Sequence, residues 1–378
     1  MNSKRSYLSK MVPIAKRILI KQKSRFIISV SGIGFSIMLM MFIVGIYEGV
    51  KTGATGYVKN SPSEIWLCQK NSSNLLRSTS FLNARIVQQV CSAEGVNKAE
   101  GILRLITTAK IRNKSKTVFL FGFEPNSKLS HPKVTQGSAN IVDGEIILDE
   151  SFVNKNNLKL NDSISIQNKI FRIAGICSET NAIVAQFSFT TLPDAQKLLG
   201  FPNVVSFILI KANESMDAFK LLQKLKSRFT TLAVFNKDEF IQNNLEEMQT
   251  GVLPILWAVG ILAAISGAAV ISLMLFSSIV EKREEYATLK AIGASSFQLF
   301  NIVIRQSILV ALVGYCFGLF LYLILSPLII GIYPEINLLL PWFAAIKLFF
   351  NSLVIGIIGA ILPLKKLSQI YPAEVFRA

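Results

Sequence analysis

Four apolar segments and one long polar segment divide this chain. Residues 26–47, 251–280, 298–330 and 343–364 are apolar over lengths that cross a bilayer as helices, since about 20 residues suffice for a span. Residues 48–250 instead mix polar positions with short apolar runs. The pattern predicts an α-helical membrane protein with four transmembrane helices and an α+β extracytoplasmic domain inserted between helices 1 and 2.

Within 48–250, alternating apolar positions predict strands, and apolar positions three or four residues apart predict helices. The sharpest signal is a hairpin in which Ser163–Gln167 and Ile170–Ile176 flank a two-residue turn. A second strand pair, Leu103–Arg112 and Thr117–Phe123, is expected around a polar turn. We expect helices over 83–90, 150–156 and 215–229, and further strands over 64–68, 145–148, 187–190, 204–210 and 231–235.

The last helix predicted in this domain covers residues 238–250. It places Phe240, Ile241, Leu245 and Met248 on one face, and no Pro or Gly interrupts it. We expect it to act as a stalk helix that continues almost rigidly into the second span, because Pro254 is tolerated in a first helical turn. The alternative is that it is only the last helix of the domain.

The distribution of charge sets the expected orientation. Only 17% of the residues are charged, against about a quarter in a soluble protein, and the net charge is +17. Residues 1–25 hold eight Lys or Arg and no acid, directly before the first span. Positive flanks stay inside, so both termini are expected in the cytoplasm and residues 48–250 outside a bacterial inner membrane. Residues 1–25 also predict a basic amphipathic helix on membrane lipids, and no nucleic acid partner is expected.

Motifs for catalysis or metal binding are missing from the sequence. It contains no GxSxG, HExxH or CxxC pattern, and the lone His131 has no ligand pattern around it. We therefore expect no enzyme activity, no metal and no bound cofactor. One disulfide among Cys68, Cys91 and Cys177 stays open as an interpretation, with buried thiols as the alternative.

The spans offer no charged path for an ion. Arg305 and Lys347, each near the start of a span, are the only charges within the last three spans, whereas ion and proton carriers keep ionisable residues along their path. This favours mechanical coupling, or handling of an amphiphile at the membrane edge, over a channel. Two GxxxG pairs are candidate helix-packing sites: Gly45, Gly49, Gly314 and Gly318.

A charged insert, residues 281–297, separates the second and third spans. It carries Tyr286, Leu289 and Ile292 at helical spacing, and Gly293 is suited to end a helix. An ordinary loop has no need of apolar residues at that spacing. The insert therefore predicts a cytoplasmic helix that contacts another protein.

Three stretches resemble the MacB/FtsX-like permease family of ABC systems. Val280–Ala294 is similar to the family segment R/E-E-x-x-x-L-K-A-L/I-G-A, Pro363–Arg377 to its Pro-Ala-Glu-x-Leu-Arg ending, and Glu145–Ile176 to its outer-domain core. The sequence of Glu285–Ala291 resembles that of the DevC-like branch, whose members work in glycolipid export.

The resemblance implies a permease dimer bound to two cytoplasmic ABC ATPase subunits, which use the ATP. The insert would be the coupling helix, with the contacts carried by Glu284, Glu285, Tyr286, Leu289, Lys290, Ala291 and Gly293. The sequence contains no GxxxxGK[ST] pattern, so we expect the ATPase to be a separate chain. A periplasmic adaptor protein is a further expected partner.

Two functions follow from this resemblance. The first is a permease that relays ATP-driven motion to the outer domain in order to export or extract a lipid, lipoprotein, haem or peptide-like amphiphile. The alternative is an FtsX-type regulatory subunit that transports nothing and activates an extracytoplasmic partner. The remaining boundaries are a short outer loop at 331–342 and a cytoplasmic tail at 365–378.

Overall fold

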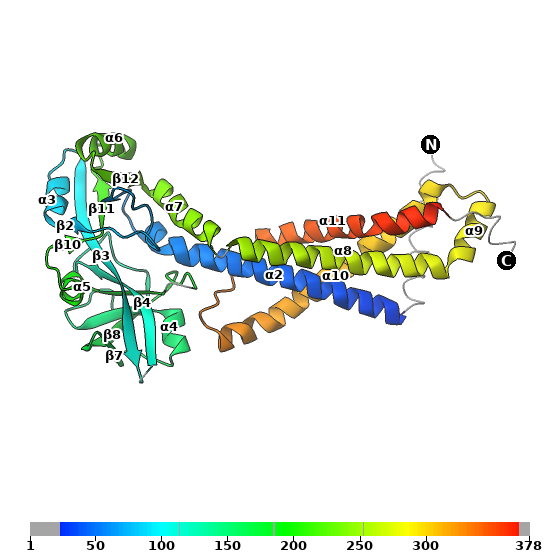
Figure 1. Cartoon of the computed structure of the whole chain (residues 1–378), viewed down its shortest axis with the longest axis horizontal. Helices are drawn as coiled ribbons and strands as arrows, with labels where there is room; N and C mark the ends of the chain where they lie inside the picture. The colour runs from blue at the N-terminus through cyan, green and yellow to red at the C-terminus, as the bar shows by residue number, and fades with distance from the viewer. Residues whose placement is uncertain (1–22, 113, 184–185, 252, 370–378) are drawn as a thin grey trace. The chain divides into compact units, whose positions relative to one another are not determined.

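The structure is a computed structural model that describes residues 23–112, 114–183, 186–251 and 253–369 (Figure 1). It consists of two compact units. The helical unit takes Met1–Ile46, Ile255–Leu328 and Leu338–Ala378, and the α/β unit takes Tyr47–Pro254 and Ile329–Asn337. The expected amphipathic helix of residues 1–25 lies almost wholly outside the described residues, as does the tail beyond residue 369.

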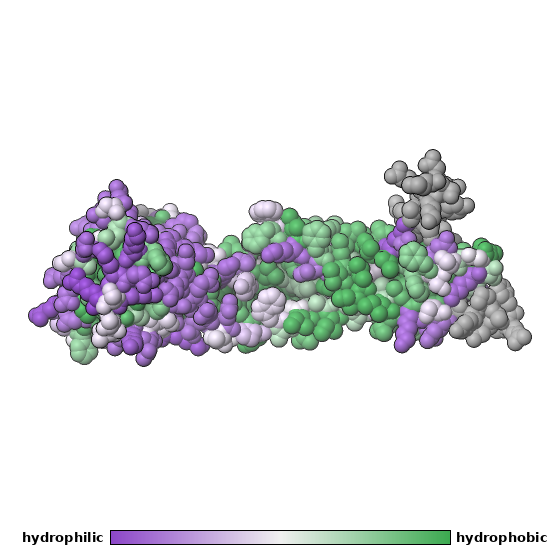
Figure 2. Space-filling view, turned by 90° about the horizontal axis from the view of Figure 1, so that it is seen from above, coloured by the Kyte–Doolittle hydropathy of each residue, from purple (hydrophilic) through white to green (hydrophobic). Residues whose placement is uncertain are grey.

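Four helices among the described residues are long and apolar enough to cross a membrane. They are α2 (Lys23–Asn60), α8 (Leu253–Glu281), α10 (Ser296–Ile332) and α11 (Trp342–Ser368), and the short α9 (Arg283–Ala291) lies between α8 and α10 in the chain. Large apolar side chains remain exposed along these helices, and Figure 2 shows hydrophobic residues covering them. Such a surface is stable in lipid, so the chain is a multi-pass membrane protein.

The helix boundaries differ from the prediction at three points. Helix α2 continues to Asn60, beyond the predicted end at residue 47, and its last turns belong to the α/β unit. Helix α10 continues through Pro327 to Ile332, two residues beyond the predicted end at residue 330. The expected continuous helix from the stalk into the second span is wrong: α7 (Lys237–Thr250) ends before Gly251, which has non-helical dihedrals (φ −100°, ψ −92°), and α8 begins at Leu253.

A ten-stranded sheet forms the α/β unit, with the strand order β12-β1-β11-β3-β4-β9-β6-β8-β5 and β7 pairing with both β3 and β8. Its strands are β1 (Ile65–Gln69), β3 (Val96–Ile111), β4 (Lys114–Phe123), β5 (Val134–Gly137), β6 (Glu145–Asp149), β7 (Ser163–Ile166), β8 (Lys169–Cys177), β9 (Phe187–Thr191), β11 (Phe207–Ala212) and β12 (Leu232–Asn236). The short β2 (Leu82–Asn83) and β10 (Val204–Val205) pair separately. Both predicted hairpins, β3–β4 and β7–β8, are confirmed.

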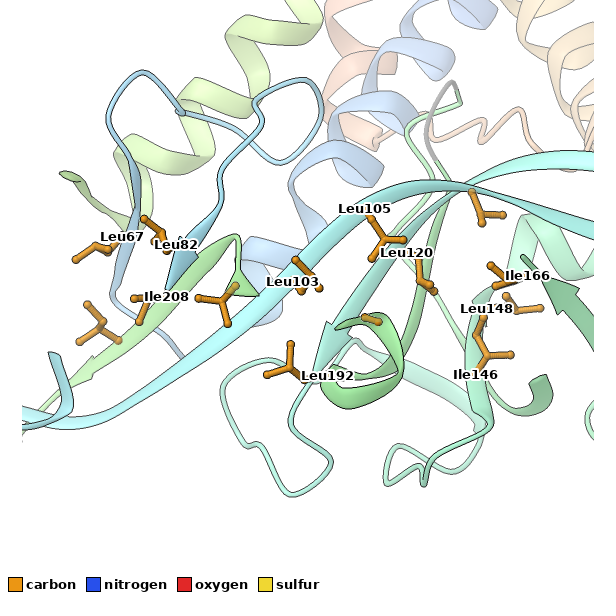
Figure 3. Packing of buried hydrophobic residues seen from close by; sticks show 14 of the residues in the cluster. Leu67, Leu82, Leu103, Leu105, Leu120, Ile146, Leu148, Ile166, Leu192 and Ile208 are labelled. Atoms are coloured by element: carbon orange, nitrogen blue, oxygen red, sulfur yellow. The ribbon is translucent and has the colours of Figure 1, made fainter. Parts of the chain in front are cut away.

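One long strand, β3, joins the two halves of this sheet. Its first half pairs with β11, and its second half pairs with β4. The pairings β3–β4, β4–β9, β9–β6, β6–β8, β8–β7 and β7–β3 close into a ring of six strands. Apolar side chains pack into the core of the unit, among them Leu105, Leu120 and Ile146 (Figure 3). A filled, closed ring has no free strand edges and is a stiff body.

Four short helices complete the unit: α3 (Arg85–Cys91), α4 (Glu150–Lys155), α5 (Leu192–Leu199) and α6 (Ala218–Arg228). The sequence prediction missed α5, although its signals are present. Thr191 caps its first turn through the side-chain oxygen, and Gly200 ends it in the left-handed conformation (φ 79°).

None of the described cysteines forms a disulfide. Cys68 and Cys177 are buried thiols, and Cys68 donates to the Ser72 carbonyl oxygen at 2.9 Å. Burial raises the pKa of Cys68 to about 12, so this thiol is unreactive at neutral pH. Cys91, in contrast, is exposed.

Candidate functional site

Helix α9 is the part of the chain that the sequence singled out, and its residue types explain its ends. Glu284 and Glu285 lie in the first turn and Lys290 in the last, which matches the helix dipole at both ends. The helix ends in a Schellman arrangement, in which Gly293 N–H donates to the Lys290 carbonyl and Ala294 N–H donates to that of Leu289. Gly293 adopts φ 94°, a conformation that glycine reaches without strain.

One face of α9 is buried in the helical unit. Tyr286 and Ala287 are 2% and 0% exposed, and Leu289 packs against the same apolar cluster. Burial raises the pKa of Tyr286 to about 12, with Glu285 adding to the rise and the Gln306 side chain of α10 opposing it. Tyr286 packs in the same apolar cluster as Ile302 and Val303 of α10, inside this chain.

Lys290 connects α9 with another helix. Its ammonium group donates to the main-chain carbonyl oxygens of Leu367 at 3.4 Å and Ser368 at 3.3 Å, in the last turn of α11. The C-terminal end of a helix carries a partial negative charge, which is stabilised by a cation at this place. Lys290 and Tyr286 thus hold α9 against α11 and α10.

The opposite face of α9 is exposed. Glu284, Glu285, Ala291 and Gly293 are all exposed there, with Glu285 paired to Lys282 at 3.2 Å. Two large apolar side chains accompany them: Ile292 is 76% exposed and Phe297, in the first turn of α10, is 77% exposed. Large apolar side chains so exposed in a charged stretch are suited to contact a protein partner.

The expected coupling residues therefore separate into two sets. The structure places Glu284, Glu285, Ala291 and Gly293 on the exposed face, and Tyr286, Leu289 and Lys290 on the face toward the other helices. The sequence pattern singled out Ile292 only as part of the apolar stripe, and it missed Phe297. The available signal for Phe297 was an aromatic residue four positions after Gly293, the residue that ends the helix.

The four candidate packing glycines also have definite neighbours. A Cβ on Gly314 would come 2.6 Å from Ile33 Cγ2, and one on Gly318 would come 2.6 Å from the Gly34 carbonyl oxygen, so both permit close approach of α10 to α2. Gly45 faces the Tyr322 hydroxyl and Leu338. Gly49 faces the main chain of Asn337, which is not in a helix.

Within the described residues, no three His, Cys, Asp or Glu side chains gather closely enough to hold a metal ion. The acids that the sequence places near the β6 strand have structural partners. Asp149 caps α4 by accepting from Ser151 N–H at 2.9 Å, and Thr191 donates to Asp143 at 2.6 Å. Asp149 and Asp143 thus both have hydrogen-bond partners within the α/β unit.

Two family models match the chain. The model of the MacB-like periplasmic core domain matches residues 26–228, and the model of the FtsX-like permease C-terminal part matches residues 257–372. The first match alone covers more than half of the chain, and the second includes α9, α10 and α11.

Three curated relatives agree with these matches. The chain is 23% identical to an uncharacterised ABC transporter permease of Mycobacterium bovis over 359 residues, which is 94% of this chain and 96% of that protein. It is 23% identical to a Staphylococcus haemolyticus protein that carries the name hemin transport system permease HrtB, over 89% of this chain and 91% of that one. The similarity to an uncharacterised ABC transporter permease of Methanocaldococcus jannaschii, 26% identical, spans 58% of each chain.

Proposed function

Because this chain belongs to the ABC transporter permeases with a MacB-like periplasmic core domain and an FtsX-like C-terminal part, we propose that it relays the movement of a separate ATPase to its own α/β unit. In this proposal the chain itself hydrolyses nothing, and ATP is used by the partner. It works as a dimer in the bacterial inner membrane, with both termini in the cytoplasm and the α/β unit outside.

The two-faced structure of α9 carries this proposal. Glu284 and Glu285 are exposed in its first turn, Ile292 is exposed directly after it, and Phe297 is exposed in the first turn of α10. Exposed apolar residues next to a short helix are suited to helix-in-groove recognition. The inner face of α9 packs through Tyr286 into the apolar cluster that includes Ile302 and Val303 of α10, and Lys290 hydrogen-bonds the end of α11. A force applied to the exposed face therefore reaches two membrane helices directly.

An amphiphile is the substrate class that fits the spans. Only Arg305 and Lys347 carry charge within the last three spans before their cytoplasmic ends, so a hydrated ion has no polar path among these helices. One curated relative carries the name of a hemin transport permease and another that of a macrolide export protein, and hemin is an amphiphile. We propose export or extraction of such a molecule at the outer membrane face, with an adaptor protein as a further partner.

The contact with the ATPase is tested by copurification. An affinity-tagged full chain is isolated from its native membranes in nanodiscs, and copurifying proteins are searched for a chain with a Walker A sequence. We expect an ABC ATPase in stoichiometric amount. Ile292→Asp with Phe297→Asp should reduce its recovery at least tenfold, since two carboxylates would have to enter an apolar groove.

A matched control separates this effect from general destabilisation. Phe201 is 65% exposed in the α/β unit, so Phe201→Asp makes the same chemical change at an unrelated surface. Recovery of the ATPase should be unaffected by it. Normal recovery with the double Asp variant would show that the exposed face of α9 is not the contact.

A further inference from the structure

The segment that links α10 to α11 is bound to the α/β unit. Ile329–Asn337, which comprise the last turn of α10 and the first part of this segment, belong to that unit. Glu335 forms an ion pair with Lys155 at the end of α4, and the Asn181 side chain donates to the Glu335 carbonyl oxygen at 2.8 Å. This segment is thus bound by α4 and by the loop after β8, and both are far from it in the sequence.

The last turns of α2, which belong to the α/β unit, contact the same segment. Three glycines, Gly49, Gly53 and Gly56, follow one another along this helix. Added Cβ atoms there would come 1.8 Å from the Asn337 carbonyl oxygen, 1.6 Å from that of Asn181 and 2.2 Å from that of Glu179, respectively. Main chain from two loops therefore lies directly against the helix, which no side chain at these positions would allow.

The ion pair adds little to the stability of the closed contact. Lys155 is 37% exposed, and ion pairs this open to solvent stabilise a structure only weakly. The second carboxylate oxygen of Glu335, Oε2, is buried and has no hydrogen-bond partner among the described residues. A buried acceptor without a partner is unfavourable, so the carboxylate of Glu335 both stabilises and opposes the closed arrangement.

We propose that residues 333–337 are a latch, which is closed in this structure and releases from Lys155 and Asn181 during each cycle of the transporter. Closed, it ties the outer ends of α10 and α11 to the α/β unit; open, it lets these helices move separately from that unit. The release rests on the proposed function, since it is driven by the ATPase. The closed contact does not depend on that function.

The closed contact is tested by crosslinking in the full chain. Lys155→Cys and Glu335→Cys are introduced together after Cys91→Ser and Cys316→Ser remove the exposed thiols, and a short bismaleimide is added in nanodiscs. The control pair is Lys224→Cys with Glu335→Cys, because α6, which carries Lys224, lies on the far side of the α/β unit from α4 (Figure 1). We expect at least fivefold more crosslink in the first pair, and equal yields would overturn the latch.

Release is tested in the complex with the copurified ATPase. Trapping with ATP and vanadate should lower the crosslink yield at least threefold, and chains crosslinked beforehand should lose most ATP turnover. An unchanged yield together with full turnover would show a fixed contact and overturn the latch. If the complex with unsubstituted chains hydrolyses no ATP, the proposed function fails and release with it, whereas the crosslink comparison still decides whether the closed contact exists.

Charge reversal provides a rescue experiment. Lys155→Glu places two carboxylates together and should open the latch, whereas Lys155→Glu with Glu335→Lys restores an opposite pair. We expect the rate of ATP turnover without substrate to rise at least twofold in the single variant. In the double variant it should return to the rate of the unsubstituted chain. Equal turnover in all three proteins would contradict a role for the latch in coupling.

Discussion

The ammonium group of Lys290 lies 3.4 Å from the carbonyl oxygen of Leu367 and joins the helix between two spans to the end of the last one. The resemblance assigned Lys290 to contact with the ATPase. Its position instead suits transmission inside the chain, because the hydrogen bond ends on main chain of α11. Exposed Ile292 and Phe297 remain as the side chains that we propose to contact the partner.

Replacing Lys290 should therefore separate binding from coupling. Lys290→Met keeps the length and the apolar stem but removes the donor, and we expect the ATPase to copurify normally while coupled ATP turnover falls about threefold to tenfold. Loss of this charge-assisted contact, roughly 1 kcal/mol, should lower the thermal midpoint by a few degrees. Lys290→Arg retains a cation and should retain most of the coupling. Loss of the ATPase from Lys290→Met would instead place Lys290 in the interface.

The fold was largely predictable where residue periodicity decides it. The spans, the insert and both hairpins follow from local patterns, whereas the partners of β3 at its two ends and the closure of the ring through β7 are contacts between distant segments. The stalk prediction failed at Gly251, because a single glycine allows the backbone to leave the helix without any change in apolar pattern.

The faces of α9 were less predictable than its existence. Periodicity placed Tyr286, Leu289 and Ile292 on a common stripe, but a stripe does not say which side faces α10 and which faces outward. The bond from Lys290 to α11 joins residues 77 positions apart, and nothing in the sequence signals it. The contact between Glu335 of the latch and Lys155 could not be predicted for the same reason.

The glycines of α2 that lie against the two loops predict opposite responses to alanine substitution in different helices. Alanine favours a helix over glycine by about 0.5–1 kcal/mol, and Gly331 in α10 has open space around it. Gly331→Ala should therefore be neutral or slightly stabilising. Gly53→Ala should be destabilising, because its Cβ would lie 1.6 Å from the Asn181 carbonyl oxygen. Thermal midpoints of the two variants in nanodiscs decide this, and equal midpoints would mean that the loop yields without cost.

Glu179 gives a prediction about pH. The Lys133 ammonium donates to it, Asn60 Nδ2 donates at 2.9 Å, and these bonds hold the pKa of Glu179 below its ordinary value. The stabilisation is thus present above the unfolded pKa of about 4.3 and is lost as the pH falls through the lower folded value. The wild type should have a higher midpoint than Glu179→Gln at pH 6, and the difference should shrink below pH 4. A constant difference would contradict the ion pair.

The proposed orientation is tested with a thiol already present. Cys91 is exposed on α3, so a membrane-impermeant maleimide should label it in intact spheroplasts. Ser295→Cys, in a chain with Cys91→Ser, should be labelled only after the membrane is permeabilised, because it follows α9 on the cytoplasmic side. The reverse pattern would invert the topology and remove α9 from reach of a cytoplasmic ATPase.

The central claim is that the exposed face of α9 receives the action of an ATPase. Its most direct measurement is the ATP hydrolysis rate of the copurified ATPase, recombined in nanodiscs with unsubstituted chain, with Ile292→Asp and Phe297→Asp together, or with Phe201→Asp. We predict that the unsubstituted and Phe201→Asp chains support the same rate and that the double variant lowers it at least tenfold. The same rate with all three chains would contradict the account.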